Sequence, residues 1–108
     1  MINDSGYNPE FAQVVNEVLE MHKKKGADYG TKDDFFANVS ASASWGISPW
    51  VGAMMRVNDK VVRLQAAAKG STLKNEGIED SLVDIATYSI IAVCLFRREQ
   101  SRSNLFDS

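Results

Sequence analysis

The residues best suited to chemistry in this chain are carboxylates that recur along one edge of a predicted helix. Glu76, Asp80 and Asp84 are spaced by four residues, and Glu79 flanks the same edge. The run 82–96 contains 12 apolar residues out of 15, which predicts a helix buried on most of its sides. A buried carboxylate is costly unless a cation or a metal ion pairs with it. We therefore expect positive charge to meet this edge.

Two sources of positive charge remain open. In the first, an Arg of a neighbouring helix forms a salt bridge with this edge, and the acids at the helix start complement the helix dipole. In the second, the carboxylates bind a hard metal ion or face a cationic cluster that handles phosphates. The chain has one Cys and one His, which excludes a structural zinc site. A bound metal would be an oxygen-ligated ion such as Mg or Mn.

A second group of charged residues recurs at helical spacing in the preceding helix. They are Arg56, Asp59, Lys60 and Arg63. These positions lie opposite the predicted core stripe of that helix, and such a face is usually solvated and stabilised by local pairs. The alternative is a face covered by another subunit, where Arg and Lys bind phosphates.

Three further sets of residues are candidates for a site. Glu17 and Glu20 lie beside the apolar stripe of the first helix, either as solvated charges or as metal ligands. His22 lies on that stripe, which favours a packed side chain over a catalytic base. Trp45 and Trp50 flank a turn, where they would form a local hydrophobic contact or stack on a base.

Composition limits the class of protein. The chain has 108 residues, of which 44% are hydrophobic and 24% charged, so we expect one domain over 1–108. The net charge of -2 argues against a duplex-binding protein. The lone Cys94 cannot form an intrachain disulfide. With no signal-peptide pattern and no apolar run long enough for a membrane span, we expect a cytoplasmic protein.

Hydrophobic periodicity predicts an all-α fold of four helices and no strand. The expected helices run from Pro9, with Asn8 as N-cap, to Gly26; from Asp33 or Asp34; from Pro49, with Ser48 as N-cap, to Lys69; and through the acidic and apolar run. Asp28 and Tyr29 fall in the loop after the first helix. The expected core stripe of the third helix is Trp50, Met54, Val57, Val61, Leu64 and Ala68. Residues 1–7 and 100–108 are expected to be loose.

The fourth predicted helix has more apolar surface than a chain of this length can cover. We therefore expect a homo-oligomer, at least a dimer. It would form through the fourth helix and the charged side of the third.

Three segments, taken in order, carry a resemblance to a known family. They are 25–30, which ends in Asp28-Tyr29-Gly30; 56–64, with Arg56-Val57-Asn58-Asp59-Lys60 followed by Arg63-Leu64; and 75–88, from Asn75-Glu76 to Tyr88. Together they resemble the nucleotide modification associated domain 1 family, small proteins common in phages and prophages. They also look like the all-α, MazG-like nucleoside triphosphate pyrophosphohydrolases. The resemblance implies an oligomeric four-helix MazG-like bundle that handles nucleotides in the cytoplasm of an infected or lysogenic bacterial host.

The wider MazG-like group binds Mg through Glu-x-x-Glu on one helix and Glu-x-x-Asp on a later one. Glu17 and Glu20 match the first motif, and Asp84 matches the end of the second. The position three before Asp84 is Ser81, with Asp80 one residue earlier. One residue rotates a side chain by about 100° around a helix, although Asp80 and Asp84 still share an edge.

The first function that the resemblance implies is Mg-dependent hydrolysis of a nucleoside triphosphate to its monophosphate and pyrophosphate. The implied metal ligands are Glu17, Glu20, Asp80 and Asp84. Glu76 or Glu79 would orient the attacking water, and Arg56, Lys60 and Arg63 would neutralise the phosphates.

The alternative is a non-catalytic sponge that sequesters a nucleotide or a cyclic-nucleotide signal of a host defence system. It would need no metal, because Arg and Lys would bind the phosphates. Asp28, Asp80 or Asp84 would orient those cations or bind sugar hydroxyls, and Asp59 is a further candidate for ligand binding. The aromatic residues that would stack on the base are Tyr29, Tyr88, Trp45 and Trp50.

Overall fold

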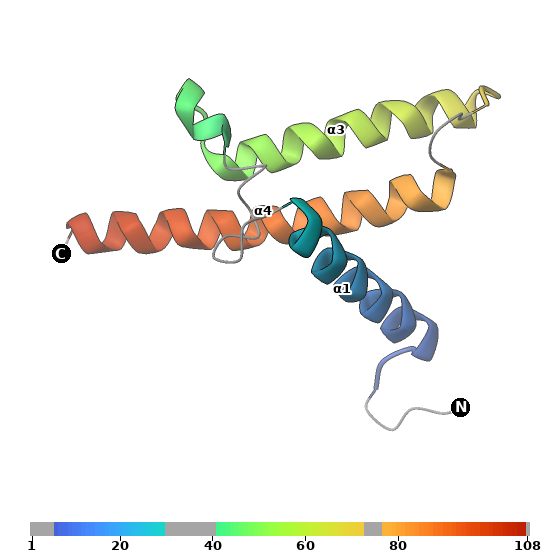
Figure 1. The fold of residues 1–108 in the computed structure, drawn as a ribbon, viewed down its shortest axis with the longest axis horizontal. Helices are drawn as coiled ribbons and strands as arrows, with labels where there is room; N and C mark the ends of the chain where they lie inside the picture. The colour runs from blue at the N-terminus through green and yellow to red at the C-terminus, as the bar shows by residue number, and fades with distance from the viewer. Residues whose placement is uncertain (1–5, 30–40, 73–76, 108) are drawn as a thin grey trace. The chain divides into compact units, whose positions relative to one another are not determined.

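The computed structural model describes residues 6–29, 41–72 and 77–107. Within these ranges the chain forms three long α-helices and one short 3-10 helix, with no strand (Figure 1). The helices are α1 (Pro9–Tyr29), η1 (Ala41–Trp45), α3 (Pro49–Ala68) and α4 (Ile78–Asp107). The all-α prediction is therefore confirmed. The short helix expected from Asp33 or Asp34 lies outside the described residues.

The chain divides into two compact units, Met1–Phe35 and Phe36–Ser108, each of which is described by itself. The first contains α1, and the second contains η1, α3 and α4. Among the described residues, none of the helices combines the length and the hydrophobicity that a bilayer span requires.

Helix α1 starts where its capping residue predicts. Asn8 Oδ1 accepts hydrogen bonds from the backbone N–H groups of Glu10, at 2.8 Å, and Phe11, at 3.1 Å. The predicted end at Gly26 is wrong, since the helix continues to Tyr29. A glycine inside a helix costs only about 1 kcal/mol relative to alanine, which neighbouring residues can offset. Asp28 and Tyr29 thus lie in the last turn of a helix rather than in a loop.

Helix α3 has the bounds that the sequence predicts, to within one residue. It ends in a Schellman motif: the N–H of Gly70 binds the carbonyl of Ala67, and the N–H of Ser71 binds that of Ala66, both at 3.0 Å. Gly70 has φ +102°, a conformation that is costly for a residue with a Cβ. The glycine therefore ends the helix.

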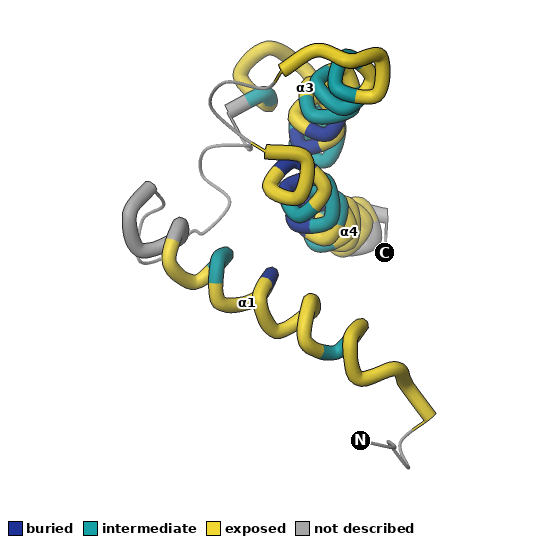
Figure 2. The backbone as a smooth tube through the Cα atoms, turned by 90° about the vertical axis from the view of Figure 1, so that its right-hand side faces the viewer, coloured by how far each residue is buried: buried dark blue, intermediate teal, exposed yellow. Residues whose placement is uncertain are grey.

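Helix α4 is longer than predicted and returns antiparallel beside α3 (Figures 1 and 2). It spans 30 residues and reaches Asp107, so the prediction that 100–108 is loose is wrong as far as Asp107. No Gly or Pro occurs in 78–107, and hence nothing in that stretch interrupts the helix.

The core of the second unit lies where α3 and α4 face each other. Ala53 of α3 is buried against Ile91, Ala92 and Leu95 of α4, and Trp50 and Tyr88 pack on this cluster. The prediction that Met54 belongs to the core stripe is wrong, because Met54 is exposed and Ala53 takes the inward position. A side chain as small as Ala53 allows two helix backbones to approach closely. Val57 of the predicted stripe is buried and Trp50 packs on the cluster, so the buried face of α3 is turned by less than one residue from the prediction.

The side of α4 that faces away from α3 is exposed (Figure 2). Leu82, Ile90 and Val93 are each about half exposed. Within the second unit, α4 therefore buries only the side that faces α3, and burial of its other sides stays a prediction. Two helices form one seam, and each helix buries only the side that faces its neighbour.

Ser48 precedes α3, as predicted, but its hydroxyl does not cap the helix. Ser48 Oγ instead donates a hydrogen bond to Glu99 Oε1 of α4 at 2.9 Å. The second carboxylate oxygen of Glu99 is buried, with no hydrogen-bond partner among the described residues. The hydroxyl therefore joins the two helices at the end of the hairpin where α3 begins.

Replacing Ser48 with Ala should lower the free energy of unfolding by about 1 to 3 kcal/mol, because a part-buried carboxylate loses a donor. Urea denaturation followed by far-UV circular dichroism measures this loss. Ser101→Ala, at an exposed position of α4, is the matched control and should stay within about 0.5 kcal/mol of the parent. Equal stability of the two variants would contradict the role of this hydrogen bond.

Candidate functional site

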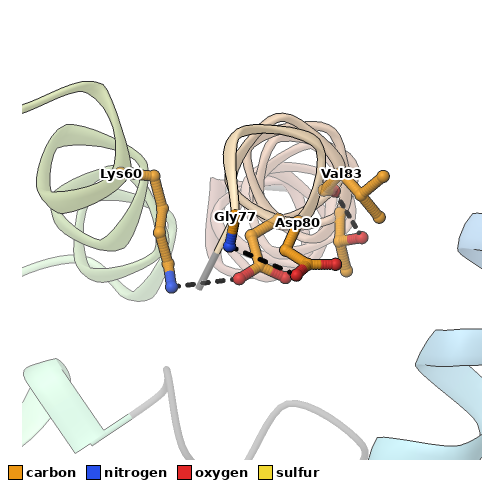
Figure 3. Close-up of polar contacts among 6 residues, drawn as sticks. Lys60, Gly77, Asp80 and Val83 are labelled. Atoms are coloured by element: carbon orange, nitrogen blue, oxygen red, sulfur yellow. Dashed lines mark hydrogen bonds and ion pairs between the residues drawn. The ribbon is translucent and has the colours of Figure 1, made fainter. Parts of the chain in front are cut away.

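An ion pair between α3 and α4 is the centre of the candidate site. Lys60 Nζ lies 3.0 Å from Asp84 Oδ2, and the two side chains are 19% and 11% exposed. Figure 3 shows Lys60 reaching from α3 toward α4. The expectation that a cation meets Asp84 is borne out by Lys60. Such a pair is less screened by water than a surface pair, so each partner constrains the other more strongly.

Lys60 does not lie on an outer face, as the spacing of the charged residues suggested. The antiparallel register brings it opposite Asp84, just as it brings Ala53 toward Ile91. Arg63 is also half-buried, whereas Arg56 and Asp59 are exposed. The prediction of one solvated charged face thus holds for Arg56 and Asp59 and is wrong for Lys60.

The seam between the two helices is polar near this pair and apolar further along. Ser81, Asp84 and Thr87 are buried polar residues of α4. Thr87 Oγ1 donates a hydrogen bond to the carbonyl of Val83 at 2.9 Å, as a Thr inside a helix often does (Figure 3). Neither Thr87 nor the buried position of Ser81 was expected from the sequence. Their spacing of three residues from Asp84 was the available signal.

Asp80 has a different environment from Asp84. It is exposed, and its Oδ2 accepts a hydrogen bond of 3.4 Å from the backbone N–H of Gly77 (Figure 3). A carboxylate in the first turn that binds back to the residue before the helix stabilises the helix start. Ser81, and not Asp80, occupies the fully buried position beside Asp84. Because Asp80 lies one residue away from the motif position, it is exposed, whereas Asp84 is buried.

Asp84 and Asp80 each have a partner for one carboxylate oxygen. Lys60 holds one oxygen of Asp84, and the Gly77 N–H binds one oxygen of Asp80. Within the described ranges, no group of three or more His, Cys, Asp or Glu side chains is arranged to hold a metal ion. Mg²⁺ at this seam would have to compete with Lys60 for Asp84. Ligation of Mg or Mn by Asp80 and Asp84 stays a prediction.

The remaining predicted acids lie elsewhere in the chain. Glu17 and Glu20 are exposed on α1, in the first unit, and Glu79 is exposed in the first turn of α4. Glu76 and the side chains of Asp28 and Tyr29 fall outside the described residues. Glu17 and Glu20 belong to the first unit, whereas Asp80 and Asp84 belong to the second. A metal site that uses ligands from both units therefore also stays a prediction.

The predicted aromatic residues divide into two groups. Trp45, in η1, is 82% exposed. Trp50 and Tyr88 pack on the core, and the Trp50 ring meets Phe96 edge-on with centroids 6.0 Å apart. A base that stacked on Trp50 or Tyr88 would compete with this packing, whereas Trp45 already offers an exposed ring.

The family relationship that the three sequence segments suggest stays a resemblance. Comparisons with known protein families, with curated proteins and with solved structures found no match to this chain.

Proposed function

We propose that this chain is a phage-type nucleotide-binding protein whose phosphate contacts lie at the polar end of the α3–α4 seam. The observation that carries the proposal is the half-buried Lys60, held by Asp84 at 3.0 Å. An ammonium group is a compact charge that binds phosphate, and a carboxylate partner fixes its direction.

Two arginines lie close to Lys60 along the same side of α3. Arg56 precedes Lys60 by four residues and Arg63 follows it by three, which places both within about 60° of Lys60 around the helix. One guanidinium group can donate two hydrogen bonds to the oxygens of a phosphate. This side of α3 therefore suits a polyphosphate better than a ligand with a single carboxylate. Trp45 would supply the exposed ring for a base.

The reaction to test first is hydrolysis of a nucleoside triphosphate to its monophosphate and pyrophosphate. In this proposal Glu17, Glu20, Asp80 and Asp84 would hold Mg, which would polarise the phosphoryl oxygens. The side chains of Arg56, Lys60 and Arg63 would bind the phosphates and orient them. The support for hydrolysis is the resemblance, together with acids on two separate helices.

The second candidate is a sponge that binds a nucleotide or cyclic-nucleotide signal without turnover. A specific observation favours it: one carboxylate oxygen of Asp84 is already engaged by Lys60, with which a metal ion would have to compete. A cation that is directed by a carboxylate can bind phosphate without any metal ion.

A panel of nucleotides, incubated with the protein with and without Mg, separates the two candidates. Chromatography before and after heating the protein shows whether each nucleotide is cleaved or returned intact. Products that form only with Mg, and are lost in Asp84→Asn, would establish hydrolysis. Intact nucleotide that is released by heat and survives chelation would establish the sponge.

In either case Arg56→Ala should weaken nucleotide binding by about 10- to 100-fold, the effect of losing one charged hydrogen bond. Arg102→Ala, at an exposed position of α4, is the control and should bind like the parent. If no nucleotide in the panel is cleaved or bound, the proposal is contradicted.

A further inference from the structure

A stripe of side chains runs along the side of α4 that faces away from α3. We call it the outer stripe, and its members are Glu79, Leu82, Ala86, Ile90, Val93 and Arg97. They recur every three or four residues and therefore share one face of the helix. The residues that face α3, such as Asp84, Ile91 and Leu95, lie on the opposite side.

The middle of the outer stripe is apolar and largely uncovered. Leu82 is 52% exposed, Ile90 55% and Val93 49%. Single exposed apolar residues are normal, but a continuous row of them along one helix face marks an interaction surface. Glu79 and Arg97, both exposed, bound this row with opposite charges.

We propose that a second copy of this chain covers the outer stripe, with the two α4 helices antiparallel. The stripe is self-complementary about its middle, near residue 88. An antiparallel copy brings Glu79 of each chain to Arg97 of the other. It also brings Leu82 beside Val93, and Ala86 beside Ile90.

Charge decides the orientation of the two copies. A parallel arrangement would set Glu79 against Glu79 and Arg97 against Arg97, which is repulsive at both ends. The antiparallel arrangement makes two attractive pairs, as a two-fold symmetric interface requires. The small Ala86 lies near the symmetry axis, where it lets the backbones approach. The proposal does not rest on nucleotide binding.

The size of the contact sets the expected affinity. One helix face against another buries less than the roughly 1,600 Å² of a standard stable interface. We therefore expect a dimer that dissociates in the micromolar range, so its population should depend on concentration.

Sedimentation equilibrium of the full chain, from about 1 to about 200 μM, tests this dimer. Glu79→Arg and Arg97→Glu should each weaken dimerisation by about tenfold, because each change replaces two attractive contacts with repulsive ones. The double variant Glu79→Arg/Arg97→Glu should return to within about twofold of the parent. Arg102→Glu, a charge reversal elsewhere on α4, should dimerise like the parent.

The rescue is specific to contact between copies. Residues 79 and 97 of one chain are separated by about 27 Å along the helix. This exceeds the screening length of about 8 Å at physiological salt, so the two charges do not interact within a chain. Ile90→Asp, at an exposed position, should abolish the dimer while circular dichroism shows unchanged helix content.

A monomer throughout the concentration range would overturn the proposal and leave the outer stripe to another occupant, such as α1 of the same chain. A dimer that is unaffected by the single reversals and by Ile90→Asp would place the interface elsewhere. If the losses from the two reversals simply added in the double variant, the antiparallel pairing would be wrong.

Discussion

Replacing Asp84 with Ala is expected to lower the free energy of unfolding by about 3 to 5 kcal/mol, the range for removing one partner of a buried ion pair. Lys60 would keep its charge at a position that is only 19% exposed, without the carboxylate that now lies 3.0 Å away. Much of the loss is the cost of that uncompensated charge. Urea denaturation of the parent and the variant measures it.

The double variant Lys60→Met/Asp84→Leu shows whether the loss comes from the pair. Replacing both members of a buried pair with apolar residues is often neutral or stabilising, so this variant should recover most of the stability. Asp59→Ala, which removes an exposed carboxylate of α3, should cost no more than about 0.5 kcal/mol. An Asp84→Ala variant as stable as Asp59→Ala would show that the pair does not hold α3 and α4 together.

The second large effect is expected at the apolar end of the same seam. Leu95 is 4% exposed and belongs to the cluster that joins α4 to α3. Leu95→Ala should lower the free energy of unfolding by about 2 to 5 kcal/mol, through lost burial and the cavity that remains. This is a large share of the roughly 5 to 15 kcal/mol by which small domains are stable.

Met55→Ala is the matched control for Leu95→Ala, because it removes a side chain of similar size that is 55% exposed. It should change the stability by less than about 1 kcal/mol. Thermal or urea unfolding of both variants gives the comparison. Similar losses for the two would mean that Leu95 is not packed between α3 and α4.

The start of α1 and both ends of α3 could be predicted because they depend on neighbours in sequence. Asn8 with Pro9 begins one helix, and Gly70 ends another. The end of α1 could not be read from Gly26 in the same way. A single glycine weakens a helix by a fixed small amount, and the surrounding residues decide whether the helix continues.

The inward face of α3 could not be predicted from periodicity alone. Met54 and Ala53 are adjacent, and both are compatible with an apolar stripe. The choice between them depends on how closely α4 approaches, which favours the smaller side chain. Lys60 follows Ala53 by seven residues and so lies on nearly the same side of α3. The error at Met54 and the misplacement of Lys60 therefore have a common origin.

The sequence by itself determined that the chain is all-α and that the carboxylate of Asp84 would need a cation. Both follow from local facts: the 3.6-residue period, and the cost of a charge in an apolar run. Only the tertiary structure decided which cation meets Asp84 and that Ser48 forms a hydrogen bond with Glu99. It also decided that α3 leaves the outer stripe of α4 exposed. The reason is that the register between two helices is set by contacts among residues far apart in the chain, which no local pattern encodes.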